Sequence, residues 1–571
     1  MTGRPPDQRP WDLETDLLVI GAGAAGMTAA LVGALEGLRT VLCEKSDMVG
    51  GTTATSAGTV WIPGSRQSDA AGVPDSIASA KIYLAAILGD AADDIRLAAY
   101  LATGPAVLDY LQQRTSVAFM PPPVHPDYHA QPGAAVGGRA LGAIPFDGRK
   151  LGKDFARVRP PRREFMVLGG MMVGKADIPS LLHPFKSWQH LAQATRLLAR
   201  QALDRIQYRR GTRLVMGNAL VARLLDSLRQ HAVDIRYHHQ LVELMADEGK
   251  IIGAVFRTGD GDVAIRARRG VVLSTGGIGW NNDLRNRLFP AGTQRFSLSP
   301  DSNTGDGILA GERVHGELAL DMTSPALWMP SSVMKQPDGH LSVFPHIMLD
   351  RARPGLIAVN RAGLRFVNEA NSYHDFVEGM LRSDRTVPTI PAFLICDRRF
   401  VRDYGLGLIH PGTRDLTGFI TSGYLFQGDS IAALARQIGV DGGTLAATLE
   451  RHARFAASGV DEDFGRGSSE LNRFNGDPAN SPNPCLRKIG PGPYLAVAVW
   501  PSDLASSAGL RTDLNGRVLQ SGGLPIPGLY AAGADAASIF RGTYPGPGTM
   551  IGPAIVFAWR AAMNIAGKLD R

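Results

Sequence analysis

Three glycines and a glutamate near the start of the chain have the types and spacing that a pyrophosphate and a ribose require. Gly21, Gly23 and Gly26 form a GxGxxG sequence, and Glu44 follows 18 residues after the last glycine. The first glycine permits a tight turn, the second lets backbone approach a pyrophosphate, and the third lets a helix pack closely on a strand. A carboxylate at the distance of Glu44 is placed to accept hydrogen bonds from ribose hydroxyls. This spacing predicts a dinucleotide-binding site.

A strand, a helix and a second strand must position these residues. Residues 16–20 (DLLVI) are a short apolar run, as expected of a buried parallel strand. A helical pattern follows to about residue 37, and residues 40–43 form a second apolar run that ends at Glu44. The N-terminus of the helix offers unpaired N–H groups and partial positive charge to phosphates. The complete unit favours dinucleotide binding over an isolated glycine-rich turn.

Three later glycine-rich segments extend the expected site. Residues 50–58 (GGTTATSAG) can wrap a second phosphate and the ribityl region through backbone amides. Residues 270–277 (GVVLSTGG) and 528–533 (GLYAAG) are each a strand pattern that runs into glycine, and a helix is predicted from about Ile551. Each segment alone fits the ordinary end of a strand. Together, segments this far apart that converge on one ligand fit a long cofactor such as FAD.

The composition is that of a large globular protein. The chain has 571 residues, a net charge of +7, 44% hydrophobic residues and 67 glycines without a Gly-X-Y period, which excludes disorder and collagen. Between the third and fourth glycine-rich segments, helical patterns and Pro/Asn-rich loops replace the strand-to-glycine signatures. We therefore predict an α/β fold, in which residues 1–300 and 490–571 form a Rossmann-type FAD-binding domain and residues 301–489 form an inserted α+β catalytic domain.

Several other classes of site are disfavoured. Cys43, Cys396 and Cys485 are far apart and form no CxxC or Cys/His cluster, so we expect no metal site and a reducing, cytoplasmic location. Residues 17–35 are uncharged, but their four glycines suit a strand, turn and helix better than a membrane span. The start of the chain has no apolar core of signal-peptide length, and we expect no integral membrane segment. Because the positive charge is not clustered, we expect no nucleic-acid partner.

The order of the motifs resembles a known flavoprotein superfamily. GAGAAG with Glu44, GGTTATSAG, STGG at 274–277, RFVNE at 365–369 and YAAG at 530–533 are similar to the superfamily that includes fumarate reductase and the 3-ketosteroid dehydrogenases. The resemblance spans nearly the whole chain. Within it, PDYH at 126–129, Ser372-Tyr373 and TYPGPG at 543–548 resemble the three active-site segments of the FAD-dependent 3-ketosteroid Δ1-dehydrogenases.

The resemblance to fumarate reductases does not extend to their chemistry. Those enzymes need an arginine acid at the position of Tyr373, and histidines that clamp a dicarboxylate in the segment matching residues 501–509. That segment reads PSDLASSAG, so a dicarboxylate would meet no cationic clamp. Residues 50–58 also lack the histidine that anchors flavin covalently in membrane-complex relatives. We therefore expect FAD to be bound non-covalently.

The motifs and the resemblance together predict the residues that contact FAD. After YAAG, relatives carry an acidic residue or Asn that bonds the ribityl chain, whereas here Ala534 precedes Asp535, so this contact is expected to shift by one residue. The predicted cofactor-binding residues are Gly21, Gly23, Ala24, Ala25, Gly26, Glu44, Lys45, Gly50, Gly51, Thr52, Thr53, Ser56, Ala57, Gly58, Thr275, Gly276, Gly277, Asp306, Gly533, Asp535 and Ile551.

The resemblance implies removal of two hydrogens from neighbouring carbons of a cyclic ketone. The Tyr544 hydroxyl and the Gly548 N–H would hold the carbonyl oxygen, where negative charge develops. Tyr373, assisted by Tyr128, would take the proton next to the carbonyl, and the hydride would go to flavin N5. Since a free tyrosine has a pKa of about 10, its proton must be shared with a neighbour or its anion stabilised. His374 and Asp375 are a weaker acid–base pair, because adjacent residues seldom face one site.

Two alternatives remain open at this point. The same machinery could desaturate a small cyclic ketone of the cyclohexanone type, since nothing in the mechanism needs the other steroid rings. A protein of a different class would bind FAD but only pass electrons or act as a scaffold. No second complete GxGxxG is present for NAD(P)H, so the external electron acceptor is left as a quinone, a carrier protein, oxygen or a dye.

Overall fold

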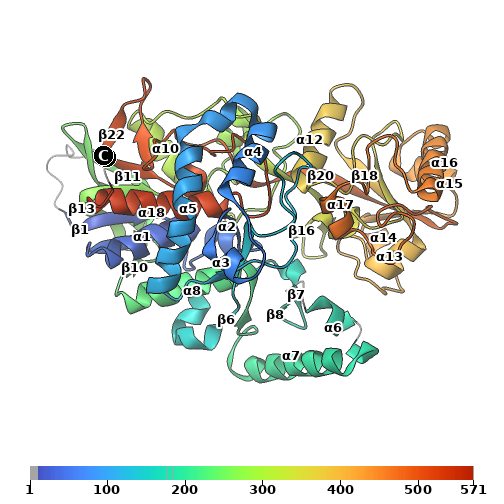
Figure 1. The fold of residues 1–571 in the computed structure, drawn as a ribbon, viewed down its shortest axis with the longest axis horizontal. Coiled ribbons are helices and arrows are strands. Elements are labelled where there is room, and N and C mark those ends of the chain that lie inside the picture. The colour runs from blue at the N-terminus through green and yellow to red at the C-terminus, as the bar shows by residue number, and fades with distance from the viewer. Residues whose placement is uncertain (1–10, 175–176, 183, 570–571) are drawn as a thin grey trace.

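Two large sheets, each with its own apolar core, dominate the structure (Figure 1). The structure is a computed structural model, and it describes residues 11–174, 177–182 and 184–569. The first sheet has eight strands and the second has seven. Helices cover both sheets, so the architecture is the predicted α/β fold with a Rossmann-type unit. No described helix has the length and apolarity needed to cross a membrane.

The first sheet contains the predicted βαβ unit. β1 (Leu13–Ile20) lies between β2 (Thr40–Cys43) and β13 (Gly261–Leu273) and is parallel to both. The end of β13 also pairs in parallel with β22 (Pro525–Ala531). Residues 17–20 are fully or almost fully buried, as expected for a parallel strand covered on both faces. The remaining strands are β10 (Asp234–Arg236), β11 (Gln240–Asp247), β12 (Lys250–Thr258) and β21 (Arg517–Leu519).

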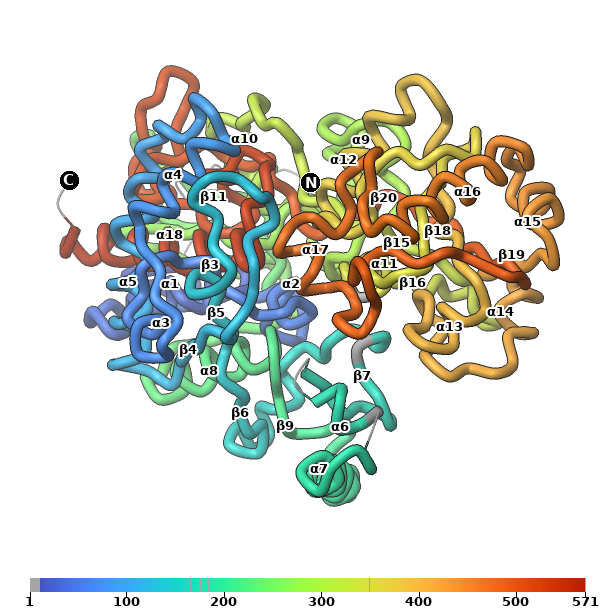
Figure 2. Tube along the Cα trace, turned by 45° about the vertical axis from the view of Figure 1, so that its right-hand side comes forward, coloured from blue at the N-terminus to red at the C-terminus, as the bar shows by residue number. Residues whose placement is uncertain are grey.

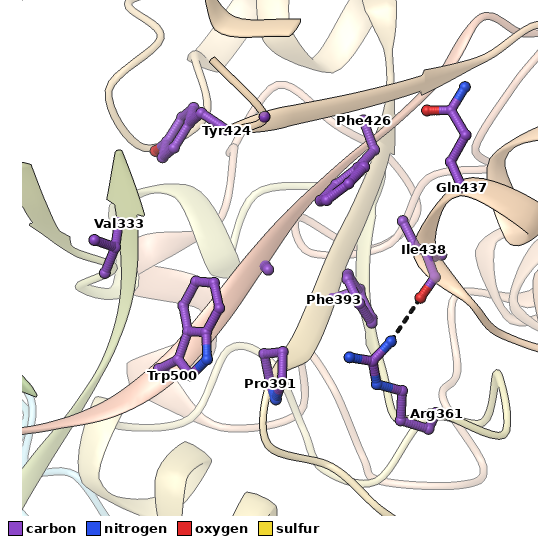
Figure 3. Close-up of a pocket in the computed structure, with 11 residues that line it drawn as sticks. Val333, Arg361, Pro391, Phe393, Tyr424, Phe426, Gln437, Ile438 and Trp500 are labelled. Atoms are coloured by element: carbon purple, nitrogen blue, oxygen red, sulfur yellow. Dashed lines mark hydrogen bonds between the residues drawn. The ribbon is translucent and has the colours of Figure 1, made fainter. Parts of the chain in front are cut away.

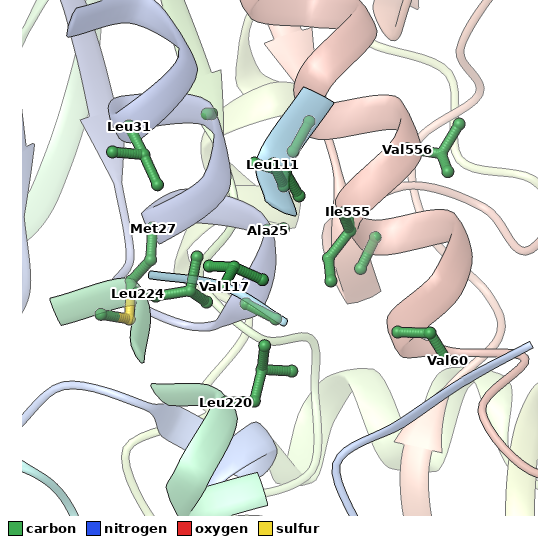
Figure 4. Packing of buried hydrophobic residues seen from close by; sticks show 14 of the residues in the cluster. Ala25, Met27, Leu31, Val60, Leu111, Val117, Leu220, Leu224, Ile555 and Val556 are labelled. Atoms are coloured by element: carbon green, nitrogen blue, oxygen red, sulfur yellow. The ribbon is translucent and has the colours of Figure 1, made fainter. Parts of the chain in front are cut away.

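Small residues let three helices pack tightly on this sheet. Figure 4 shows Ala25 and Met27 of the first helix gathered with Leu220, Leu224 and Ile555 of the two others. The first ten residues of the first helix are all buried, because it is covered by neighbours on every side. The helices are α1 (Ala24–Leu35), α8 (Met216–Gln230) and α18 (Ile551–Ile565), and α5 (Ile95–Arg114) packs on α18.

The second sheet is organised around β20 (Tyr494–Ser506). This strand pairs in antiparallel with β15 (Ala326–Lys335) and β18 (Ala392–Asp397). β14 (Phe296–Ser297) and β19 (Leu425–Gly428) also pair with it, while β16 (Leu341–Pro345) and β17 (Leu356–Val359) form the edges. Its helices are α9 (Asn282–Leu288), α11 (Met348–Arg351), α12 (Tyr373–Asp384), α13 (Arg398–Tyr404), α14 (Thr417–Thr421), α15 (Ile431–Ile438), α16 (Gly442–Ser458) and α17 (Glu470–Asn475).

Strand pairing divides the chain differently from the boundaries expected at residues 300 and 490. Leu284 of α9 and the strand β14 lie with the second sheet, although they precede residue 300. α10 (Asp306–Arg313) returns to the first sheet, where it contacts β11. Strand β20 stays in the second sheet until Ser506. We therefore propose that the second unit comprises residues 282–297 and 326–506, because long-range pairing and not local composition assigns a strand to its sheet.

Residues 51–215 form smaller elements between the sheets and at the edge. β3 (Thr59–Trp61), β5 (Ala140–Ala143) and β4 (Phe119–Met120) form a small sheet. The long helix α7 (Trp188–Gln207) projects from the body in both views (Figures 1 and 2). The other elements are α2 (Gly51–Ala54), α3 (Arg66–Ala70), α4 (Ile77–Leu88), α6 (Ile178–Leu182), β6 (Phe146–Asp147), β7 (Met166–Val167), β8 (Met171–Met172) and β9 (Arg213–Leu214).

A buried ion network ties the RFVNE segment to the second unit. Glu369, which is fully buried, accepts hydrogen bonds from Arg365 Nε at 2.8 Å and from Arg466 Nη1 at 3.1 Å. Asp461 bonds the other side of Arg365 at 2.9 Å. Burial raises the pKa of Glu369, but the charges of Arg365 and Arg466 outweigh this effect and lower it to about 2. The carboxylate is therefore ionised throughout the ordinary pH range.

We expect Glu369→Gln to lower the free energy of unfolding by about 3–5 kcal/mol at pH 7, since it leaves two buried arginines under-compensated. The wild-type advantage is present above the ordinary glutamate pKa of about 4.3 and is lost as pH falls toward 2. Urea unfolding at several pH values measures it. Glu450→Gln is the control, because this exposed carboxylate only pairs with Arg454 at 3.7 Å. Equal losses in both variants would contradict the expectation.

Candidate active site

The predicted cofactor segments meet at one edge of the first sheet. Gly21 directly follows β1, and Glu44 directly follows β2. One residue separates Thr275 from the end of β13, and one residue separates Gly533 from the end of β22. Because these four strands are parallel, their carboxyl ends lie at the same edge. Ligands of open α/β sheets bind at this edge. The sheet topology therefore brings together segments separated by more than 500 positions in the sequence.

The GxGxxG glycines have the geometry that their spacing predicts. Gly21 has a φ of +99°, and a Cβ there would lie 2.3 Å from Ser274 O. A Cβ on Gly26 would lie 1.8 Å from Gly21 O, so helix α1 can approach the strand only with glycine at this position. At Gly23, which caps α1, no atom lies within 4 Å of a built Cβ. Open space at this helix N-terminus, beside Ala24 and the buried Ala25, fits a pyrophosphate.

Glu44 and Lys45 lie beside this turn. Glu44 accepts hydrogen bonds from the backbone N of Ala22 and Ser46, both at 2.9 Å, which holds the ends of β1 and β2 together. Lys45 Nζ bonds Asp306 Oδ2 at 3.0 Å, so two predicted cofactor residues form an ion pair with each other. Their contacts with FAD remain predictions.

The loop of residues 50–58 folds over the N-terminus of α1. Gly50 N donates to Ala22 O at 2.7 Å, and Thr53 Oγ1 accepts from Ala24 N at 3.2 Å. Thr52 Oγ1 accepts from Asn303 Nδ2 at 3.0 Å. Positive φ values at Gly50, Gly51 and Gly58 turn the loop, Ser56 Oγ bonds Thr53 O, and Ala57 is exposed.

Asp535 organises the turn after β13. Its carboxylate accepts hydrogen bonds from Thr275 N at 2.6 Å and from Gly277 N at 3.1 Å, and it is fully buried. Burial raises its pKa, although the bonds from Thr275 and Gly277 act in the opposite direction. Asp535 therefore positions Gly276 and its neighbours, and its expected contact with the flavin stays a prediction. Gly533 adopts φ +70°, and Ile551 begins α18.

Three tyrosines from distant segments form one hydrogen-bonded chain. The Tyr128 and Tyr373 hydroxyls lie 3.0 Å apart, and the Tyr373 hydroxyl donates to that of Tyr544 at 2.9 Å. All three side chains are buried. Their rings meet edge to face, with centroids 5.2–5.6 Å apart. The apolar residues packed around them are Leu298, Leu327, Met329, Met348 and Leu471.

Two loops carrying tyrosines are tied together behind the site. Tyr128 N donates to Pro545 O at 2.9 Å, and the Tyr83 hydroxyl of α4 donates to the same carbonyl at 2.6 Å. The buried Asp127 carboxylate accepts from Trp61 Nε1 and from Arg139 Nη1, both at 2.8 Å. The loop conformation at Tyr128 is therefore set by a network of buried polar groups.

Tyr373 is the first residue of α12. Ser372 caps this helix, since its Oγ accepts from Asp375 N at 3.1 Å. His374 packs its ring edge to face on Tyr544, with centroids 6.1 Å apart, and its Nδ1 accepts from Trp328 N at 3.2 Å. Burial lowers the pKa of His374 to about 3. Asp375 lies 3.9 Å from His129. His374 therefore has a structural partner and does not form an acid–base pair with its neighbour.

Gly548 lies against the strand that follows the 50–58 loop. Its φ is +100°, and a Cβ would lie 2.6 Å from Val60 C, so a side chain does not fit. Its carbonyl accepts from Trp61 N at 3.2 Å. Among the described residues, no group accepts its N–H, and the expected contact of this N–H with a ligand stays a prediction. Tyr544 and Gly548 belong to the same loop.

Burial controls the ionisation of the tyrosine chain. It raises the pKa of Tyr128, Tyr373 and Tyr544 well above the ordinary value of about 10. In Tyr128 the hydrogen bond with Tyr373 acts in the opposite direction and lowers the pKa. The chain is therefore neutral at pH 7, and a charge formed on one hydroxyl is stabilised by the next.

A cavity of about 290 Å³ lies elsewhere, on the second sheet. Figure 3 shows Phe393, Phe426 and Trp500 around it, with Arg361 bonded to Ile438 O at 2.8 Å. None of the three tyrosines lines it. In the described part of the chain, no group of three or more His, Cys, Asp or Glu side chains is placed to hold a metal ion.

The sequence did not reveal several residues that position the site. Tyr83, Asp127, Arg139 and Asn303 all fix loops that carry predicted residues. Asn303 donates to both Thr52 and the Gly276 carbonyl, and it lies three residues before Asp306, a predicted cofactor-binding residue. Its position in that segment was the only local signal. The other three act through contacts between segments far apart in the sequence.

Known proteins share this arrangement over the whole chain. Residues 16–551 match the FAD binding domain family. A 3-oxosteroid 1-dehydrogenase of Mycobacterium tuberculosis is 37% identical, with 98% of this chain and 99% of that protein covered. A 4-oxocyclohex-2-ene-1-carboxylate 5-dehydrogenase of Sinomonas cyclohexanicum is also 37% identical, over 96% and 93% of the two chains.

A solved structure agrees with these relatives. The 3-ketosteroid Δ1-dehydrogenase of Sterolibacterium denitrificans, in complex with 1,4-androstadiene-3,17-dione, superposes with a TM-score of 0.90 at 33% identity, covering 97% of this chain and 100% of that one. The parallel strand ends, the glycine turn and these matches agree on FAD as the cofactor. The chain belongs to the FAD-dependent 3-ketosteroid Δ1-dehydrogenase family of flavoprotein oxidoreductases.

Proposed function

We propose that this protein desaturates the carbon–carbon bond next to the carbonyl of a 3-ketosteroid. The observation that carries the proposal is the hydrogen-bonded chain of Tyr128, Tyr373 and Tyr544, the last of which shares a loop with Gly548. A catalyst for this reaction needs donors at the carbonyl oxygen and a base at the neighbouring carbon. The chain and the Gly548 loop supply both kinds of group in one place.

Each residue has a distinct task in this proposal. In the neutral chain the Tyr544 hydroxyl accepts from Tyr373, so its own hydrogen can donate to the carbonyl oxygen, and Gly548 N–H is a second donor. The Tyr373 hydroxyl proton leaves to solvent before the reaction; its oxygen then takes the proton from the carbon next to the carbonyl, and the Tyr128 hydroxyl stabilises the ionised oxygen by donating a hydrogen bond to it. FAD, when bound without a covalent link, supplies the acceptor for the hydride that leaves the next carbon. The electron pair of the C–H bond that loses the proton becomes the new double bond, and the electron pair of the other C–H bond leaves with the hydride.

The surroundings of the tyrosines favour a steroid over a small keto acid. The buried residues packed against them are Leu and Met, whose side chains suit fused apolar rings. The relative from Sinomonas cyclohexanicum acts on an oxocyclohexene carboxylate, so the small-ring alternative keeps a specific observation in its favour. A non-catalytic FAD-binding role would not require the three buried hydroxyls.

We also propose a reducing, cytoplasmic location with an external electron acceptor and no nucleic-acid partner. Cys43, Cys396 and Cys485 are all buried free thiols, which agrees with a compartment that does not form disulfides. The acceptor is a small molecule or protein that reoxidises the flavin.

We expect Tyr373→Phe to lower kcat/KM about 10²–10⁴-fold, because it removes the base and leaves the ring in place. Steady-state assays on an androst-4-en-3-one substrate measure turnover. The ratio of flavin absorbance to protein concentration measures FAD content. Tyr424→Phe is the matched control, since Tyr424 is equally buried but bonds Ser332 at 2.7 Å, away from the site. Normal turnover in the Tyr373→Phe variant would contradict the role of Tyr373 as the base.

We expect kcat/KM of the wild type to rise with pH from 6 to about 10 without a plateau. The reason is that burial raises the pKa of Tyr373, so the ionised share keeps growing throughout this interval. Steady-state rates with an excess of artificial acceptor give the profile. A maximum near pH 7 followed by a fall would contradict the assignment of tyrosine as the base.

We expect androst-4-ene-3,17-dione to be turned over at least tenfold more efficiently than 4-oxocyclohexanecarboxylate or cyclohexanone. The apolar cluster around the tyrosines stabilises the additional rings, each of which adds apolar contact area. Parallel kcat/KM measurements with one acceptor test this ratio. The reverse ratio would favour the small-ring alternative. If none of these ketones is desaturated, the proposed function is wrong.

A further inference from the structure

Arg351, the last residue of α11, carries a fully buried positive charge. Among the described residues, the hydrogen-bond acceptors of its guanidinium are all backbone carbonyls. Nε donates to His346 O at 2.9 Å, and Nη1 donates to Glu369 O at 2.6 Å. Nη1 and Nη2 both lie 3.4 Å from Asn371 O. A buried charge that bonds only neutral groups is unfavourable in a folded protein, so this arginine requires a physical explanation.

The nearest carboxylates are directed to other side chains. Asp350 lies beside His346, Glu369 beside Arg466 and Asp375 beside His129. In the described part of the chain, no carboxylate forms an ion pair with the Arg351 guanidinium. Burial lowers the pKa of Arg351 to about 10, and the charges of the three carboxylates oppose this effect. Arg351 is therefore positively charged at pH 7 without a direct counter-ion.

The hydrogen bonds of Arg351 fix the path of the chain into α12. Glu369 and Asn371, whose carbonyls it holds, come just before this helix, and Tyr373 is the first helical residue. The guanidinium also lies over the ring of Phe376 in the first turn, with its carbon 4.7 Å from the ring centroid. Arg351 is therefore held against the start of the helix that carries Tyr373.

The charge of Arg351 acts on the tyrosine hydroxyls. Burial raises the pKa of Tyr373, and Tyr128 adds to this effect, whereas the hydrogen bond with Tyr544 and the positive charge of Arg351 lower it. Coulomb attraction between two charges is stronger inside a protein than in water. Arg351 therefore supplies a full positive charge that favours the ionised Tyr373 oxygen, while the two other tyrosines offer it hydrogen bonds.

We propose that Arg351 is a positioning residue of the active site, which fixes the start of α12 and stabilises the ionised Tyr373 oxygen through its charge. The inference rests on the proposed function, in which Tyr373 is the base. The two charges need not touch, because Coulomb attraction acts across several ångströms of protein. The charged and titratable groups that face Tyr373 or Arg351 are Tyr128, Tyr544, Asp350, Glu369, Asp375 and Arg466.

The pH profile of an enzyme with a more acidic phenol at position 373 tests this role. We expect 2,3,5-trifluorotyrosine in place of Tyr373 to bring the plateau of kcat/KM into the measurable pH range. In this background Arg351→Gln should lower the ionisation constant about tenfold, because the amide keeps hydrogen-bond donors but has no charge. Arg351→Lys, which keeps the charge, should restore most of this loss. Arg353→Met is the control, since Arg353 donates to Gly476 O at 2.7 Å and should leave the profile unmoved.

Asp350→Asn is a second variant with the opposite expected shift. It removes a negative charge beside Arg351 and keeps an oxygen for the bond from Arg351 N at 2.8 Å. The plateau should therefore be reached at lower pH. Flavin content and thermal unfolding show whether each variant has folded.

A purely structural role of Arg351 has a different signature. It would lower the height of the plateau in Arg351→Gln without moving the pH at which the plateau is reached, and this result would overturn the proposal. If Arg351→Gln does not fold, an unmoved profile in Asp350→Asn would overturn it. If fluorination alone leaves the profile of the enzyme with Arg351 unchanged, Tyr373 is not the base, and the proposed function fails together with this inference.

Discussion

The rest of the site depends on the contact among three tyrosine hydroxyls inside an apolar cluster. Tyr128 is 245 residues from Tyr373, and Tyr373 is 171 residues from Tyr544, so three separate parts of the fold must converge to within hydrogen-bond distance. A hydroxyl in apolar surroundings is unfavourable unless it is bonded, and each tyrosine provides that bond for the next. The supporting bonds from Tyr83 and Asp127 follow from this requirement, because the loops must be held where the hydroxyls meet.

The cofactor edge could be predicted from the sequence because its signals are local. Gly26 is required by its contact with Gly21 in the same turn, and the apolar runs on either side identify the strands. The family and the FAD cofactor were confirmed by the matches to known proteins. The individual residue contacts with FAD and substrate stay predictions, although the structure brings most of those residues to one edge.

The features that escaped prediction depend on long-range contacts. β20 is a buried apolar strand with no mark of its sheet, so its pairing with β15 and β18 could not be inferred, and the expected boundary at residue 490 fell before it. Asp535 follows YAAG, yet its partners are Thr275 and Gly277, 260 and 258 residues earlier.

The path of the chain between the two sheets has a mechanical consequence. After Gly277 it passes to α9 and β14, it returns with Asn303 and α10, it crosses again into β15, and it leaves β20 at Ser506, whose hydroxyl bonds Ala534 O. A domain hinge concentrates rotation in a few residues. Four crossings and a shared hydrogen-bonded edge connect the two halves, so a rotation between them would have to bend four segments at once. We therefore expect passage of a rigid polycyclic molecule to the tyrosines to use local movements of loops and side chains.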